Sequence, residues 1–276
     1  ITNVGSVTNT LSNVKVMSGD TDVSKNYSIT SVDGTLTINA KAATLTVTLS
    51  STSYVYDGNT KTPTITVKDG DKVLKATTDY TVSGTTSEKV VGSYTITIAG
   101  AGNYKGSTGS AKWSITKASV AIPSSPANKT YTGVSQAHGI TIPGTASVVT
   151  SGSTTSATDV NTYNVVLKLN DTANYQWSDG TITNKTVTWK IVAKAMTADM
   201  VTLEYSSVKF DGSAKQPTVT VKIGSTVIAN SNYTVNYTNN TNVGTATVKV
   251  TGKNNLSGEA SKTFTINTTA YSIGYN

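Results

Sequence analysis

The chain has 276 residues, a formal net charge of +7 and no cysteine. Without cysteine it can form no disulfide framework, no thiol nucleophile and no thiolate metal site. All of its basic residues are lysines, scattered along the sequence, so the arginine contacts on which nucleic-acid binding relies are missing. We expect no nucleic-acid partner, and the lysines favour solubility and a weak attraction to acidic glycans or cell-wall polymers.

The residue composition predicts an all-β fold. Thr, Ser, Val, Asn, Gly and Tyr dominate, leucine is sparse and only two phenylalanines occur. β-Branched and aromatic residues suit pleated strands, whereas Asn, Gly and Asp suit turns. No stretch has a sustained apolar period of 3.6 residues, and no apolar run is long enough to insert into a membrane. The abrupt start at Ile1, without a signal peptide or anchor motif, suggests a fragment of a longer protein.

A short pattern recurs four times at a nearly constant period. A bulky apolar residue stands two positions before an isoleucine, and successive copies are 77, 76 and 75 residues apart. The copies are Leu36-Thr37-Ile38, Trp113-Ser114-Ile115, Trp189-Lys190-Ile191 and Phe264-Thr265-Ile266. A constant period of this length indicates one structural unit built several times in a row.

Residues 1–41 match only the second half of that unit. Thr2-Asn3-Val4-Gly5 corresponds to Thr241-Asn242-Val243-Gly244 near the other end of the chain. If the unit is a two-layered β-sandwich, half of it leaves an open sheet edge and an uncovered apolar face. We therefore expect this segment, called the remnant below, to be what is left of a truncated domain.

Three complete units follow: repeat 1 (42–117), repeat 2 (118–194) and repeat 3 (195–268). Each begins with a strand-like run and continues with a turn in which an aromatic residue stands two positions before glycine. These turns are Tyr56-Asp57-Gly58, Tyr131-Thr132-Gly133 and Phe210-Asp211-Gly212. Glycine supplies the positive φ that such turns require, and Asp or Thr can hydrogen-bond the nearby backbone.

The second half of each repeat contains a long alternating strand and then an asparagine corner. The corners are Asn26-Tyr27 in the remnant and Asn103-Tyr104, Asn174-Tyr175 and Asn255-Leu256 in the repeats. About six or seven short strands, separated by turns, are typical of an immunoglobulin-like β-sandwich. Because the linkers between repeats are very short, we expect tandem sandwiches in an elongated, semi-rigid array, with 269–276 as a tail or linker.

The Tyr-Asp-Gly turn, the run 91–98 and the Asn-Tyr corner together resemble the MBG/YDG-type repeats of large bacterial surface proteins. The resemblance spans almost the whole chain, and its strongest stretches are 174–181 and 188–191. It implies a secreted, wall-associated Gram-positive protein in which such repeats form stalks, sometimes beside mucin- or glycan-binding modules. Thr132 in place of the turn aspartate and Leu256 in place of the corner tyrosine depart from the pattern. The resemblance implies no catalytic residue.

Candidate catalytic groups are few and dispersed. His138 is the only histidine and lies in a loop-like context, with no partner for a base–nucleophile pair nearby. The glutamates Glu88, Glu204 and Glu259 fall in different repeats or strands. We expect no enzymatic activity and no cofactor.

The residue types permit two further kinds of site, a calcium site and an isopeptide crosslink. The pairs Asp20/Asp22 and Asp69/Asp71 could offer oxygen atoms to Ca²⁺, but two carboxylates fall short of the six to eight ligands that Ca²⁺ takes. Both pairs lie where hairpin turns are expected, so we predict no metal site. Lysine and asparagine are abundant enough to permit a Lys–Asn isopeptide crosslink, although no acid stands out to catalyse one.

The three tryptophans separate into two classes. Trp113 and Trp189 align with Leu36 and Phe264, and a position that accepts Leu, Phe or Trp is a core position chosen for volume. Trp177 has no counterpart in the other repeats. With Tyr175 it could form a shelf for a glycan, or its indole could fold over the end of the sandwich as a lid, and we favour burial.

The sequence favours structural stalk or spacer repeats of a secreted or cell-wall-anchored bacterial surface protein, adhesin-like and extracellular, acting as a monomeric rod. One alternative is a carbohydrate- or mucin-binding module, with repeat 2 contacting host or dietary glycans. Another is a set of accessory domains of an extracellular glycan-active enzyme. A β-grasp fold would need a helix across the sheet, and no segment predicts one.

Overall fold

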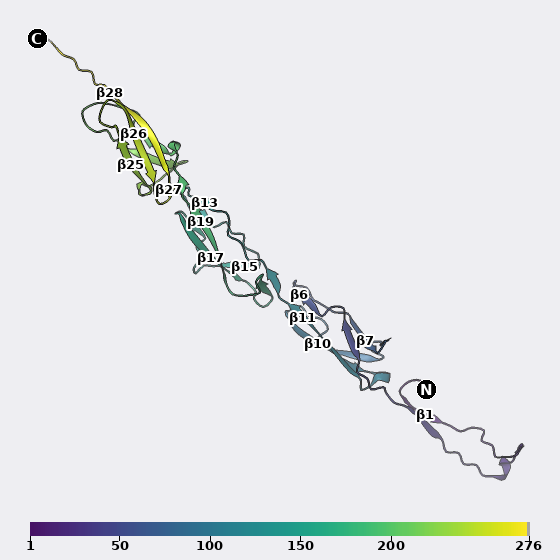
Figure 1. The fold of residues 1–276 in the computed structure, drawn as a ribbon. Coiled ribbons are helices and arrows are strands. Elements are labelled where there is room, and N and C mark those ends of the chain that lie inside the picture. The colour runs from purple at the N-terminus through teal and green to yellow at the C-terminus, as the bar shows by residue number, and fades with distance from the viewer. Residues whose placement is uncertain (275–276) are drawn as a thin grey trace. The chain divides into compact units, whose positions relative to one another are not determined.

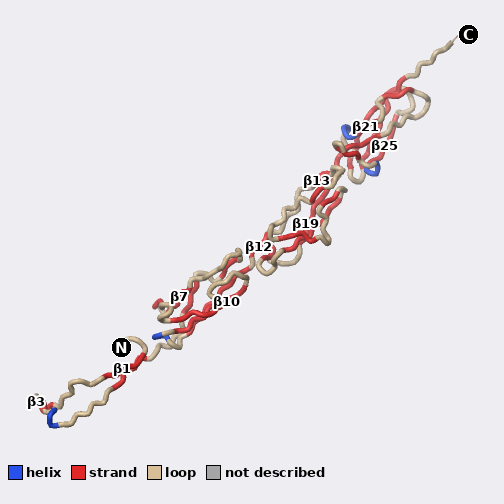
Figure 2. The backbone as a smooth tube through the Cα atoms, turned by 180° about the vertical axis from the view of Figure 1, so that it is seen from behind, coloured by secondary structure: helices blue, strands red, loops and turns tan. Residues whose placement is uncertain are grey.

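The computed structural model describes residues 1–274, which form strands, loops and short 3-10 turns (Figure 2). No α-helix occurs among those residues, so the prediction of an all-β fold is confirmed. None of their helical turns has the length and apolar character needed to cross a membrane. The chain divides into two compact units. Residues 1–118 and 173–175 form the first, and residues 119–172 with those from 176 onward form the second.

The remnant is a single layer of strands. Strand β1 (Gly5–Asn9) pairs antiparallel with β4 (Gly34–Ile38), which places Val7 opposite Leu36. A small hairpin of β2 (Met17–Ser18) and β3 (Thr21–Asp22) follows β1 in the chain. Leu36 is 50% exposed and Val7 45% exposed, because no second sheet covers them. The prediction of an uncovered apolar face is confirmed.

Repeat 1 forms two sheets (Figure 1). The larger consists, in spatial order, of β6 (Ser53–Val55), β11 (Thr108–Thr116), β10 (Gly92–Gly100) and β9 (Tyr80–Gly84). The smaller consists of β5 (Thr46–Leu49), β7 (Ile65–Asp69) and β8 (Lys72–Val73). The early strand β6 runs parallel to β11, and every other pair is antiparallel. The two sheets form an immunoglobulin-like sandwich.

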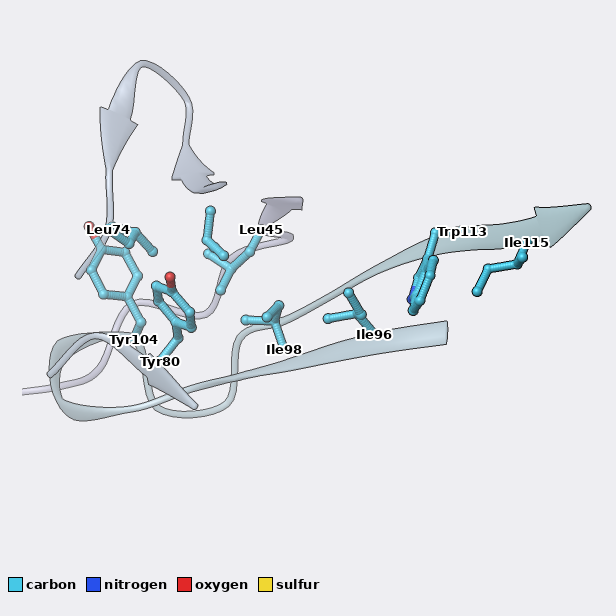
Figure 3. Close-up of a cluster of buried hydrophobic side chains, with 9 residues drawn as sticks. Leu45, Leu74, Tyr80, Ile96, Ile98, Tyr104, Trp113 and Ile115 are labelled. Atoms are coloured by element: carbon cyan, nitrogen blue, oxygen red, sulfur yellow. The ribbon is translucent and has the colours of Figure 1, made fainter. Parts of the chain in front are cut away.

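The core of repeat 1 lies between these sheets, and its side chains are drawn in Figure 3. Ile96 and Ile98 alternate with exposed threonines along β10 and are fully buried. The Trp113 ring packs against Tyr94, with ring centroids 4.9 Å apart, and its indole N–H donates to the Thr85 carbonyl at 2.9 Å. A buried indole needs such a partner for its N–H.

Repeat 3 has the same two-sheet order as repeat 1. Its larger sheet consists of β22 (Ser207–Lys209), β28 (Glu259–Asn267), β26 (Gly244–Gly252) and β25 (Tyr233–Thr238). Its smaller sheet consists of β21 (Val201–Leu203), β23 (Val219–Ile223) and β24 (Thr226–Val227). A further pair, β20 (Lys194–Ala195) and β27 (Leu256–Ser257), joins the linker to the asparagine corner.

Repeat 2 keeps the larger sheet but has a different second layer. The larger sheet consists of β13 (Lys129–Thr130), β19 (Lys185–Val192), β17 (Asn161–Leu169) and β15 (Ala146–Val149). Two-stranded pairs replace the three-stranded sheet, namely β14 (Gln136–Ala137) with β16 (Ser156–Ala157) and β12 (Ala118–Val120) with β18 (Tyr175–Trp177).

The recurring aromatic position is a core position in every complete repeat. Trp113, Trp189 and Phe264 are each 2% exposed. Trp189 packs against Tyr163 and donates its indole N–H to the Thr154 carbonyl. These two contacts correspond to those of Trp113 with Tyr94 and with the Thr85 carbonyl. The core assignment is confirmed for these three residues, and Leu36 differs because the remnant lacks a facing sheet.

Candidate functional site at the asparagine corners

Trp177 and Tyr175, the two residues of the possible glycan shelf, differ in exposure. Trp177 is completely buried, and its indole N–H donates to the Thr183 carbonyl at 2.9 Å. Tyr175 is half-buried, and its ring packs edge-on against Tyr56 at a centroid distance of 5.4 Å. A sugar stacks on an exposed aromatic face, and Trp177 offers none.

The other candidate residues take part in local turn structure. The His138 Nδ1 accepts the Ile140 N–H at 2.8 Å. Asp22 accepts the Ser24 N–H at 3.0 Å and lies 3.3 Å from the Lys15 ammonium, while Asp69 pairs with Lys41. Within residues 1–274, no group of three or more His, Asp or Glu side chains is arranged to hold a metal ion.

The aspartates of the aromatic turns are held by lysines. Asp57 accepts the Asn59 N–H and pairs with Lys61, and Asp211 accepts the Ser213 N–H and pairs with Lys215. In each case the lysine is the main cause of a lowered aspartate pKa. A similar pair forms outside these turns, where Lys185 and the Thr181 N–H lower the pKa of Asp179 to about 2.

In repeat 2, Thr132 replaces the aspartate of the turn, and the residue four positions later changes as well. Where Asp57 and Asp211 have a lysine at that spacing, Thr132 has Gln136. The Gln136 amide donates to the Thr130 carbonyl at 3.0 Å, so it closes the same turn without an ion pair. The aspartate and the lysine are therefore replaced together, as expected if they form one turn-stabilising pair.

The asparagine corners are the feature that recurs with the same long-range contact. In each complete repeat the Oδ1 atom of the corner asparagine accepts the backbone N–H of a valine that lies 83 to 99 residues earlier in the chain. The pairs are Asn103 with Val4 at 2.8 Å, Asn174 with Val91 at 3.4 Å, and Asn255 with Val160 at 2.7 Å. We call each pair an asparagine clasp.

The main chain of the same asparagines holds the linker. Their carbonyl oxygens accept the N–H of Lys41 at 2.8 Å, of Ala118 at 2.9 Å and of Lys194 at 3.1 Å. One residue thus binds both the linker that leads into its repeat and the loop that precedes the long strand of the repeat before. A corner with two such bonds restrains the linker more than either bond alone.

In the clasps of Asn103 and Asn255, both ends of the carboxamide bind the preceding loop. The Asn103 amide nitrogen donates to the Asn3 Oδ1 at 3.0 Å, and the Asn255 amide nitrogen donates to the Asp159 carboxylate at 2.8 Å. The loop thus offers a backbone N–H donor beside a side-chain acceptor, and a carboxamide can bind both in one orientation only. The clasp of Asn174 has the longest bond to a valine N–H, 3.4 Å.

The clasp of repeats 2 and 3 is the most enclosed. Asn255 is 8% exposed, and its backbone N–H donates to the Asn232 Oδ1 at 3.3 Å. Tyr131, 5% exposed, lies beside it, and burial and the Asp159 carboxylate raise the pKa of its phenol. Gly133 (φ +81°) lies so close to Thr226 and Ile228 of repeat 3 that a Cβ atom would come within 2.9 Å of both side chains. The two repeats therefore meet through apolar as well as polar contacts.

The sequence predicts these corners as turns within a repeat, but not the contacts that they make with the preceding loop. The signal that could have revealed the clasp is the pairing of two motifs. A corner asparagine occurs in every complete repeat, and a Val stands immediately before Gly5, Gly92, Asn161 and Gly244, at the start of each long strand. The asparagine and the valine of a clasp are 83 to 99 residues apart in the sequence, so the motifs alone do not show that the two residues make contact.

Comparisons with known proteins identify a family. The model of the MBG domain matches residues 45–119 and 199–270, which lie mostly in repeats 1 and 3 and make up more than half of the chain. No significant match is found among curated protein sequences. The exact limits of the three repeats stay a prediction.

Solved structures give only a distant likeness. The protocadherin gammaB7 EC3-6 structure is 11% identical over 87% of this chain and 81% of its own, with a TM-score of 0.21. The human desmocollin-1 ectodomain is 10% identical over 86% of this chain and 61% of its own, with a TM-score of 0.16. Scores this low support no statement about fold or function. The family match to two separate segments, together with the repeated two-sheet order, shows that the chain belongs to the MBG domain family.

Proposed function

We propose that this chain is a spacer segment of a bacterial surface protein, secreted or anchored to the cell wall, in which clasped MBG modules hold a functional part of the protein away from the cell. The observation that carries the proposal is the asparagine clasp, present at the corner of each complete repeat. A spacer must resist bending where modules join. A hydrogen bond to both the linker and the preceding loop acts at that point.

The size of the effect follows from ordinary hydrogen-bond energies. A net contribution of about 0.5–1.5 kcal/mol for each hydrogen bond is too small to hold two free modules together. Joined by a short linker, however, the two partners are at a high effective concentration, so weak contacts suffice to restrain the junction. The clasp therefore suits modules of one polypeptide.

The bracing role is tested by replacing one clasp. In Asn255→Ala the bonds to Val160 and Asp159 are lost, so we expect repeats 2 and 3 to tumble more independently in ¹⁵N NMR relaxation, whereas the intact chain gives one correlation time for both. The control is Lys253→Ala, which alters an exposed side chain two positions away. Equal correlation times for both repeats in Asn255→Ala would refute the bracing role.

Surface location is tested separately. An antibody against this chain should label intact cells of the source organism, and brief treatment of those cells with protease should remove the signal. Labelling that appears only after lysis would contradict the proposed location while leaving the clasps unaffected. Adhesion to glycans is not part of the proposal, because Trp177, the tryptophan that suggested it, is completely buried.

A further inference from the structure

Repeat 3 contains a fourth copy of the clasp loop. Thr241-Asn242-Val243-Gly244 precedes β26 and is identical in sequence to Thr2-Asn3-Val4-Gly5, the loop that holds Asn103. The two glycines also share an unusual backbone conformation, with φ of +151° at Gly5 and +135° at Gly244. The same four residues, with a similar φ at the glycine, offer the same backbone N–H and side-chain oxygen.

Within residues 1–274, no corner asparagine binds this fourth loop. The asparagines at 103, 174 and 255 are engaged with Val4, Val91 and Val160. Val243 is 50% exposed, compared with 38% for Val4, while Val91 and Val160 are half-buried. Residues 239–245 line a mostly polar hollow of about 370 Å³. The side chain of Asn240, one of these residues, donates a hydrogen bond to the Lys215 carbonyl at 2.8 Å.

We infer that Asn242, Val243 and Gly244 form a socket for the corner asparagine of a further MBG module joined to the chain after repeat 3. The ligand chemistry is a carboxamide. Its oxygen accepts the Val243 N–H, and its NH₂ donates to the Asn242 Oδ1, as Asn103 does at Val4 and Asn3.

The further module belongs to the same polypeptide, because every clasp in the structure joins neighbouring modules of one chain. Each corner asparagine binds the loop of the preceding repeat and the linker between the two. The equivalent linker position after repeat 3 is Thr269, three residues beyond Ile266, as Lys41 and Lys194 are beyond Ile38 and Ile191. Two hydrogen bonds would bind a separate molecule only weakly, whereas a tethered module gains from its effective concentration.

The remnant of a second chain is a poorer occupant. Asn26 ends a 3-10 turn of residues 24–26, whereas Asn103 lies in the middle of the turn of residues 102–104, so the two side chains leave the backbone at different points. The inference depends on the geometry of the clasps and not on the spacer role, so each can fail without the other.

The test extends the full chain by one module. Residues 269–276 are replaced by a second copy of 194–276, which keeps the linker spacing, and the exchange of the Val243 amide hydrogen is compared with that in the unextended chain. We expect the protection factor of Val243 to rise at least about fivefold, since the amide would exchange only when the junction opens. Asn255→Ala in the appended copy alone should abolish the rise, and Lys253→Ala in that copy should preserve it.

Two measurements keep the result interpretable. Protected Val248 and Val250 amides in the appended copy would show that it is folded in each variant. Asn242→Ala in the socket should reduce the rise, because the acceptor for the NH₂ group is lost. Unchanged Val243 protection in a folded, extended chain would overturn the inference. Protection that depends on protein concentration would overturn the assignment to the same polypeptide and indicate a second copy instead.

Discussion

Residues of the same type have different roles at different positions of this chain. Trp113 and Trp189 fill a core position shared with Phe264, whereas Trp177 is buried at a position with no tryptophan in the other repeats. The asparagines differ in the same manner. Asn254 donates to the Ser231 carbonyl of its own repeat, whereas the adjacent Asn255 reaches Asp159 of the preceding one. Residue type alone does not distinguish these roles.

Trp177→Ala should destabilise repeat 2 by about 3–5 kcal/mol, because it removes a fully buried indole and leaves a cavity. Hydrogen exchange of the β17 amides measures this loss locally. Ile182→Ala, which truncates a side chain that is 45% exposed in the same loop, should change stability by less than about 0.5 kcal/mol. A Trp177→Ala variant as stable as the parent would contradict the burial of the indole.

Asp211 should make the stability of repeat 3 depend on pH. Lys215 and Ser213 lower its folded-state pKa below the ordinary 3.8, so the folded state binds a proton less readily than the unfolded one. The stabilisation is therefore complete above pH 3.8 and is lost as the pH falls from there through the folded-state pKa.

Exchange of the Val248 amide between pH 7 and pH 2 measures this dependence. Asp211→Asn should be less stable than the parent at pH 7 and should lose less stability below pH 4. Asp199→Asn, which alters another exposed carboxylate of repeat 3, serves as the control. The same acid dependence in parent and Asp211→Asn would rule out this ion pair as its source.

At the scale of elements, the corner that carries each clasp asparagine is built in two forms. In repeats 1 and 3 the long strand ends at Gly100 or Gly252, and the asparagine follows three residues later. A Cβ atom on Gly252 would lie 2.8 Å from the Ser257 nitrogen and 2.9 Å from the Leu256 carbonyl carbon. In repeat 2 the strand ends at Leu169 and the asparagine comes five residues later, so the longer corner leaves room for a side chain.

Gly252→Ala should therefore destabilise the corner of repeat 3 by about 1–3 kcal/mol, since backbone atoms must move to admit the methyl group. The loss should appear in the exchange of the β26 amides and, because the corner carries Asn255, at the Val160 amide as well. Gly144→Ala is the matched control, because a Cβ atom there meets nothing within 4 Å. A Gly252→Ala variant with unaltered exchange at both places would show that the corner has more room than the structure indicates.

At the scale of the whole molecule, stability differs between complete modules and the remnant. Repeats 1 and 3 bury a core between two sheets, whereas the remnant has one pair of longer strands, a small hairpin and many exposed apolar side chains. An isolated two-stranded ribbon is at best marginally stable. The bonds of Asn103 to Val4 and Asn3 restrain only its base.

Limited proteolysis with trypsin should cut the remnant first. Lys15 has a side chain that is 62% exposed, and Lys25 is also exposed, so cleavage after these residues should precede any cut in the repeats. Lys215, with a side chain that is 10% exposed, should be cut late. Mass spectrometry of a digestion time course gives the order, and a first cut beyond residue 42 would contradict it.

The sequence by itself determined the repetition, the all-β fold and the core positions. These follow from period and alternation, because a strand that buries one face must repeat apolar residues every second position, and a repeated module must repeat its core. Only the tertiary structure decided the roles of Asn103, Asn174 and Asn255 and the burial of Trp177. A hydrogen bond across 83 to 99 residues depends on how modules meet, and the exposure of a residue in a unique loop depends on where that loop packs. The corner asparagines and the valines before the long strands recur in the sequence, but no local pattern shows that they meet.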